Sequence, residues 1–124
     1  FDIFTLVLSG KQPLLQTLVS SSSDDIQPSW SPDGRYVAFY VRSEKYDTKI
    51  AVTPVNRSRP PYVVAHNTSL PSFGGPQWLT NTEILYVGEE HLSVSQNSIY
   101  AIDISTGRRT SAPMSVLLTI VRRK

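Results

Sequence analysis

The sequence predicts an all-β fold made of repeated units, and three observations support this. Nine prolines and six glycines are spread over 124 residues, a composition typical of short strands joined by turns rather than of helices. Two unrelated motifs each recur at a spacing of about 48 residues, and the segment 36–41 is apolar on both faces. The length suffices for one modest hydrophobic core, so we expect a single soluble unit.

The spacing of the two motifs indicates the type of repeat. The first motif, Pro28-Ser29-Trp30, returns 48 residues later as Pro76-Gln77-Trp78. The second, Ile3-Phe4-Thr5-Leu6, is followed 47 and then 49 residues further on by Ile50-Ala51-Val52-Thr53 and Ile99-Tyr100-Ala101-Ile102. A repeat of this length with about four short strands is typical of a β-propeller blade, and no apolar stripe of helical period is present. The predicted fold is a β-propeller of four-stranded antiparallel blades.

Each blade is expected to contain strands A, B, C and D in chain order, and the N-terminus supplies only a C–D pair. The predicted strands are C at 3–8 and D at 12–18, then A near 27–30, B at 36–41, C at 49–54 and D near 61–65, then A near 75–78, B at 84–88, C at 98–103 and D near 109–113. The chain then holds about two and a half blades: a half blade at 1–18, a blade at 19–65 and a blade at 66–113, with 114–124 as a C-terminal strand or tail.

The clearest hairpin signal is the turn Ser31-Pro32-Asp33-Gly34 between strands A and B. Proline at the second turn position fixes a suitable φ, and glycine at the fourth readily adopts a positive one. Asp33 is therefore interpreted as a turn residue and not a catalytic one. Because strand 36–41 is apolar on both faces, it must be covered on both sides, as neighbouring blades would do. Trp30 and Trp78, just before the A–B turns, are predicted to pack between blades.

These residues resemble the TolB-type propeller repeat, whose hallmark is a Pro-x-Trp-Ser-Pro-Asp-Gly segment followed by an Ala-Phe strand end. The matching residues are Pro28, Trp30, Ser31, Pro32, Asp33, Gly34, Ala38 and Phe39. The second copy keeps the Pro and Trp but has Leu79-Thr80-Asn81-Thr82-Glu83 in place of the turn. The resemblance covers about residues 1–113. It implies a binding scaffold of the kind found in six-bladed propellers of the bacterial envelope, including the periplasmic partner of the Tol-Pal system, or in regulatory domains attached to peptidases.

Two and a half blades do not close a ring, since closed propellers typically have about four to eight. Three explanations stay open. The chain, which begins with Phe1 and not Met, is part of a longer propeller; or the tail strand Ser115 to Val121 joins the N-terminal C–D pair when copies assemble a ring; or the fold is an open or different β structure. The remaining blades are thus expected from a longer parent chain or from oligomerisation.

Several classes of function are not supported by the sequence. Net charge is only +2 with no cysteine, so we expect no nucleic-acid partner, no thiolate metal site and no thiol nucleophile. Gly-x-Ser-x-Gly is absent, and His66 and His91 lack any orienting or metal-binding motif, so no catalytic, cofactor or metal residue is predicted. Asp24-Asp25 and Glu89-Glu90 are interpreted as solvated loops. No signal peptide is found, and the apolar run 116–121 is too short to span a bilayer.

Function is instead expected on loops, because strand residues of a propeller are committed to packing. The B-to-C loops and the D-to-A loops should emerge on one face of mixed charge. The predicted residues for binding a protein or peptide partner are Arg42, Lys45, Tyr46, Glu89, Glu90 and His91. The predicted function is a non-catalytic interaction scaffold, periplasmic by the resemblance. The alternatives are the substrate-gating propeller of a prolyl-oligopeptidase-like serine peptidase and the sensory domain of a membrane-anchored regulator.

Overall fold

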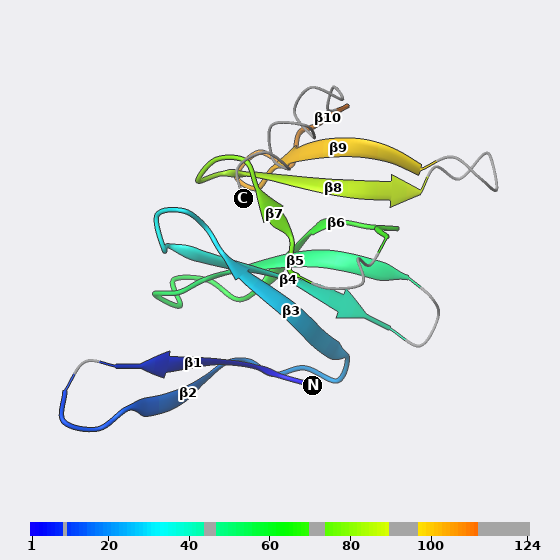
Figure 1. Ribbon diagram of the computed structural model, residues 1–124. Coiled ribbons are helices and arrows are strands. Elements are labelled where there is room, and N and C mark those ends of the chain that lie inside the picture. Colours follow the sequence, from blue (N-terminus) through cyan, green and yellow to red (C-terminus); the bar gives the residue numbers. More distant parts are fainter. Residues whose placement is uncertain (9, 44–46, 70–73, 90–96, 112–124) are drawn as a thin grey trace.

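The computed structural model describes residues 1–8, 10–43, 47–69, 74–89 and 97–111. These residues form three antiparallel sheets that lie one above another (Figure 1), which we call the first, second and third blades. The first blade is β1 (Ile3–Val7) paired with β2 (Leu14–Val19). The second blade has the order β3-β4-β5-β6, with β3 (Asp24–Trp30), β4 (Tyr36–Arg42), β5 (Thr48–Pro54) and β6 (Tyr62–Ala65). The third has the order β10-β9-β8-β7, with β7 (Gln77–Trp78), β8 (Glu83–Glu89), β9 (Asn97–Asp103) and β10 (Arg109–Ser111).

The predicted fold class is confirmed, because two sheets of four antiparallel strands follow the predicted A-B-C-D order. Every strand predicted between residues 3 and 111 overlaps an observed one, and the differences lie at strand ends, while the predicted strand or tail at 114–124 lies outside the described residues. The A strand of the second blade begins at Asp24, three residues before the predicted start, and that of the third blade is only Gln77–Trp78. The described part of the chain contains no helix long and apolar enough to cross a membrane.

The A–B turn of the second blade is built by its side chains as the sequence predicts. Gly34 has a φ of +72° and donates its N–H to the Ser31 carbonyl at 2.9 Å. The Asp33 carboxylate accepts from the Ser31 hydroxyl at 2.7 Å and from the Arg35 N–H at 3.1 Å. Ser31 in turn accepts the Tyr36 N–H. Asp33 is therefore a turn residue, whose carboxylate accepts hydrogen bonds within the turn.

The third blade closes the corresponding turn with a different residue. The Thr80 hydroxyl accepts the N–H groups of Thr82 and Glu83 at 3.2 and 3.1 Å. The Leu79 N–H reaches the Glu83 carbonyl at 2.8 Å. A tight hairpin therefore survives the loss of the Pro-Asp-Gly sequence.

The second blade is covered on both faces, as its apolar B strand predicts. Ala38 and Tyr40 on one face belong to the larger core cluster, which continues into the third blade. Phe39 on the other face is 1% exposed and packs in a smaller cluster that reaches the first blade. The buried members of the larger cluster are Ala38, Tyr40, Ile50, Val52, Ala65, Ile84, Tyr86, Tyr100, Ile102 and Ile104. Those of the smaller cluster are Ile3, Val19, Phe39 and Ala51.

The prediction that both tryptophans pack between blades is correct for Trp78 and wrong for Trp30. Trp78 is half-buried against the larger cluster, and its indole N–H donates to the Ser29 carbonyl at 3.2 Å. Trp30 is 55% exposed. The two positions differ in the strands available to them. Trp78 contacts β3, the A strand of the second blade, whereas the first blade has only its C and D strands among the described residues. The strand register itself holds, since Trp30 lies opposite Val37 as Trp78 lies opposite Ile84.

Candidate functional site

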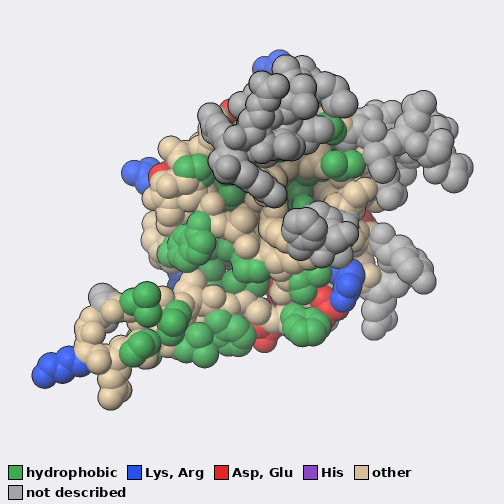
Figure 2. Space-filling view, in the orientation of Figure 1, with side chains coloured by type: hydrophobic (Ala, Val, Ile, Leu, Met, Phe, Trp, Pro, Cys, Tyr) green, Lys and Arg blue, Asp and Glu red, His purple; other side chains and the backbone are tan. Residues whose placement is uncertain are grey.

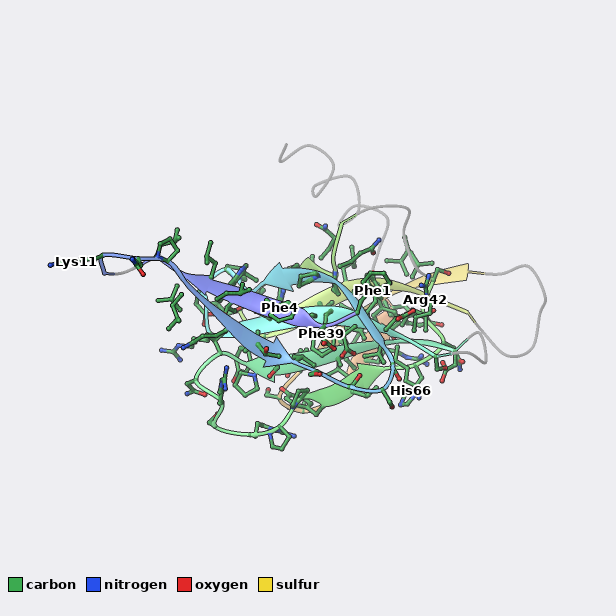
Figure 3. All side chains as sticks on the ribbon, turned by 90° about the horizontal axis from the view of Figure 1, so that it is seen from below. Phe1, Phe4, Lys11, Phe39, Arg42 and His66 are labelled. Atoms are coloured by element: carbon green, nitrogen blue, oxygen red, sulfur yellow. The ribbon has the colours of Figure 1, made fainter. Side chains whose placement is uncertain are left out.

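The connections from B to C and from D to the next A meet at one end of the blades. Figure 3 shows Arg42 and His66 at this end, far from Lys11 at the tip of the β1–β2 hairpin. The N–H and hydroxyl of Thr68 both donate to the Thr48 carbonyl, at 2.9 and 3.1 Å. Asn67 donates its N–H to the Asp47 carboxylate at 3.3 Å. We call this region, where the two kinds of loop are tied to each other, the loop end.

The best-defined charged pair of the loop end joins the first residue of β3 to the last residue of β4. Arg42 Nη2 lies 3.0 Å from Asp24 Oδ2, and both side chains are partly exposed. This hydrogen bond, followed by the one from the Phe1 amino group, holds the pKa of Asp24 below its ordinary value. A second pair, Lys49 Nζ to Asp47 Oδ2 at 3.4 Å, joins the start of the neighbouring strand β5 to the residue just before it. Both signs of charge are thus held in fixed positions at the loop end.

A β-bulge decides which acid meets Arg42. The pairing of β3 with β4 shifts by one residue between Ile26 and Ser29, where Gln27 has a φ of +52°. Counted straight from the pair Trp30–Val37, Arg42 would lie opposite Asp25. The bulge moves Asp24 opposite Arg42 and places Asp25 opposite Val41.

The interpretation of Asp24-Asp25 as a solvated loop is therefore wrong. Both residues belong to β3, and Asp25 is 2% exposed. Its carboxylate accepts the Ser21 hydroxyl at 2.8 Å. Burial raises the pKa of Asp25, and the Ser21 hydrogen bond opposes the rise. His66, by contrast, is exposed, and no group of three or more metal-binding side chains occurs among the described residues.

The six residues predicted to bind a partner are only partly visible at the loop end. Arg42 lies there, held by Asp24. Glu89 is the last residue of β8, opposite Asn97. Lys45, Tyr46, Glu90 and His91 lie outside the described residues. The binding set as a whole stays a prediction.

The opposite end of the second blade carries a shallow hollow of about 450 Å³. It lies between the A–B turn and the C–D turn, and Arg35 and Tyr36 are its titratable residues. Its lining residues are Gly34, Arg35, Tyr36, Pro54, Val55, Asn56 and Ser58. The hollow combines no nucleophile with a base, so it offers no arrangement for catalysis.

One exposed surface was not predicted from the sequence. Leu6 lies opposite Leu15 across the β1–β2 hairpin, and Phe4 lies opposite Thr17. Phe4, Leu6 and Leu15 are each more than half exposed, and Figure 2 shows apolar side chains gathered along this hairpin. The segment 3–8 is apolar on both faces, as 36–41 is. The argument used for 36–41 would therefore have predicted that both faces of β1 are covered, whereas one face is exposed.

Comparison with known proteins identifies the fold. No family model matches the sequence, and no curated protein matches it. Among solved structures, TolB from Acinetobacter baumannii superposes with a TM-score of 0.59 at 20% identity, over 86% of this chain and 25% of TolB. The apo form of AtxE2 isopeptidase superposes with a TM-score of 0.54 at 17% identity, over 78% of this chain and 19% of the isopeptidase.

These blades have the TolB-like propeller fold. The chain spans about a quarter of the length of TolB and about a fifth of that of the isopeptidase. It therefore corresponds to part of a propeller, as the sequence resemblance implies. At these identities the likeness establishes the architecture, and function has to be argued from the site.

Proposed function

We propose that this chain is a non-catalytic scaffold that binds a protein or peptide partner through the loop end. The observation that carries the proposal is the pair Arg42–Asp24 at 3.0 Å beside the pair Lys49–Asp47 at 3.4 Å, where Arg42 and Lys49 lie at the loop ends of β4 and β5, two paired strands with buried middle residues. Charges anchored on a rigid sheet lose little conformational freedom on binding. Such a surface favours partners with complementary charge. Complementary charge contributes more to the specificity and association rate of a complex than to its affinity.

The setting we propose is the periplasm of a bacterial envelope. Its support is the likeness to TolB together with the Trp-Ser-Pro-Asp-Gly segment at 30–34. Fractionation of cells that express the parent protein tests the setting. Recovery in the periplasmic fraction supports it, and recovery with a cytoplasmic marker enzyme contradicts it.

Two arginines provide a matched test of the loop end. Arg42 and Arg35 are both exposed and paired with an aspartate, at 3.0 and 3.8 Å, at opposite ends of the same hairpin. The partner is first captured by cross-linking in periplasmic extract, then purified and titrated calorimetrically. Arg42→Ala is expected to weaken binding by more than about 1 kcal/mol, and Arg35→Ala to leave it unchanged.

A double variant extends the test to loop residues outside the described part of the chain. Replacing Tyr46 and His91 with Ala should also weaken the complex. Equal affinity of the unsubstituted chain, the Arg42 variant and the double variant would show that the partner binds elsewhere, and the proposal would fail.

The likeness to an isopeptidase favours a second candidate, the substrate-gating propeller of a peptidase. In that case the loop end would select substrates for a catalytic domain carried by the parent protein. Arg42→Ala would then change the cleavage of large substrates relative to small ones by that parent. A parent protein with no hydrolase activity eliminates this candidate.

A further inference from the structure

The A–B and C–D turns of the blades lie at the end opposite the loop end, toward the left in Figure 1, and we call this region the turn end. Its charge differs from that of the loop end, where most of the described acids lie. The described cations of the turn end are Lys11, Arg35, Arg57, Arg59, Arg108 and Arg109, and its described acids are Asp33, Glu83 and Asp103. The turn end is therefore basic, although the whole chain carries a net charge of only +2.

Two acids of the turn end are used by their own turns. The Asp33 carboxylate accepts the Ser31 hydroxyl at 2.7 Å. The Asp103 carboxylate accepts the Ser105 hydroxyl at 2.6 Å. These hydrogen bonds are the main reason why the pKa of each carboxyl lies below its ordinary value. Arg35 Nε lies 3.8 Å from Asp33 Oδ2, and its side chain is 80% exposed, so this arginine keeps most of its hydrogen-bonding capacity for another molecule.

Two tyrosines share one face of the second blade at the turn end. Tyr36 of β4 lies opposite Pro54 of β5. Tyr62 of β6 lies opposite Val52, two residues earlier in β5. Directly opposed residues in antiparallel strands point to the same face, as do residues two apart in one strand. The Tyr62 hydroxyl also donates to the Ile104 carbonyl at 3.3 Å, so this aromatic face is fixed against the third blade.

Arg59 is held on this aromatic face. Its guanidinium lies 3.7 Å from the centroid of the Tyr62 ring, and the residue is exposed. It makes no ion pair with any acid among the described residues. A stacked guanidinium still presents N–H groups at its edge, and these can form two parallel hydrogen bonds to a carboxylate. Arg59 is therefore an oriented and unneutralised anion-binding group.

The hollow of about 450 Å³ lies beside these groups. Arg35 and Tyr36 line it, and Pro54 and Val55 give it apolar walls. The Val55 N–H donates to the Arg35 carbonyl at 2.9 Å, which ties the A–B turn to the C–D turn. Pockets for small molecules enclose most of their ligand, and this shallow hollow does not. It suits one side chain of a longer segment that continues over the turns.

We propose that the turn end of the second blade binds an acidic peptide segment, with one apolar side chain in the hollow and carboxylates on Arg35 and Arg59. A nucleic acid fits less well, because its backbone needs a denser row of cations and offers no apolar side chain. The site lies at the opposite end of the blade from Arg42, so it is independent of any partner at the loop end.

The probe is a short acetylated and amidated peptide in which glutamates flank one leucine. It is titrated into the 124-residue chain and followed by two-dimensional NMR of the backbone amides. One control peptide has glutamine in place of every glutamate, and another has glycine in place of the leucine. The chain variants are Arg35→Gln and Arg59→Gln, with Arg42→Gln at the loop end as the matched control. Urea unfolding confirms that each variant is folded.

The proposal predicts that the amide signals of residues 34–36 and 55–58 shift while those of Thr48 and Lys49 do not. Arg35→Gln and Arg59→Gln should each weaken the peptide by about twofold to fivefold, as expected for exposed ion pairs, and Arg42→Gln should leave its affinity unchanged. Both control peptides should bind more weakly. No binding, equal binding of the glutamine peptide, or equal affinity of all variants overturns the proposal. Tighter binding of a single-stranded RNA oligonucleotide of the same charge would assign the turn end to nucleic acid and would also overturn it.

Discussion

Phe39→Ala tests whether the first two strands are a half blade packed on the second blade. Phe39 is 1% exposed and stands among Ile3, Val19 and Ala51, so its loss removes the largest side chain of that cluster. Truncating a buried phenylalanine costs about 3–5 kcal/mol. We expect the lower end, about 3 kcal/mol, because the β1–β2 hairpin pairs with no other described strand and can move to fill part of the cavity.

Phe4→Ala is the matched control for this prediction. Phe4 lies on the opposite face of β1 from the buried Ile3 and is 51% exposed. Full burial of a phenylalanine contributes about 1.5–3 kcal/mol, so a half-exposed ring is worth about 1 kcal/mol. Urea unfolding of both variants, followed by circular dichroism with equal m-values, measures the difference. A loss below about 1 kcal/mol for Phe39→Ala, or equal losses for the two variants, would refute the packing of the first blade.

Three further predictions concern the turn, the tryptophans and the buried acid. Gly34 has a φ of +72°, and a Cβ added there would meet no heavy atom within 4 Å, so Gly34→Val is expected to lower the free energy of unfolding by about 1–2 kcal/mol through backbone strain alone. Thermal unfolding should show a smaller loss for Gly34→Asn, and equal losses for the two variants would contradict the positive φ at Gly34. Trp78→Ala is expected to lower the free energy of unfolding by about 3 kcal/mol, and Trp30→Ala to lower it by less than about 1 kcal/mol, because Trp30 is 55% exposed. If urea unfolding gave the larger loss for Trp30→Ala, the packing of the blades described above would be wrong. Burial raises the pKa of Asp25, so the stability that its carboxyl contributes is complete below the unfolded pKa of 3.8 and is lost as pH rises through the folded value. Asp25→Asn should therefore be more stable than the unsubstituted chain near pH 7 and equally stable near pH 3. A difference in free energy of unfolding that does not change with pH would contradict the raised pKa of Asp25.

The fold could be predicted where local signals and packing agree. Segment 36–41 shows its two buried faces in its composition, and the turn at 31–34 shows its hairpin geometry in Pro32 and Gly34. Both signals depend on residues close together in the chain. A single sequence is therefore enough to show them.

The candidate site was harder to predict because it depends on one bulge. The polar run Asp24-Asp25-Ile26-Gln27-Pro28 has the composition of a loop, and nothing in it indicates that Gln27 adopts a φ of +52°. That single shift decides that Asp24 meets Arg42 and that Asp25 is buried. The error at Trp30 has another origin, because the described first blade consists of β1 and β2 alone and offers no A strand like the β3 that Trp78 contacts.

The central claim is that a half blade, in which β1 pairs only with β2 among the described strands, precedes two four-stranded blades. Residue-resolved hydrogen exchange of β1, β5 and β9 in the 124-residue chain tests it most directly. Strands paired on both sides should protect every amide at Ile50–Val52 and Tyr100–Ile102, while β1 should show slow and fast amides in alternation from Phe4 to Val7. Uniform protection along β1 in the monomer, or fast exchange throughout β5, would contradict the account.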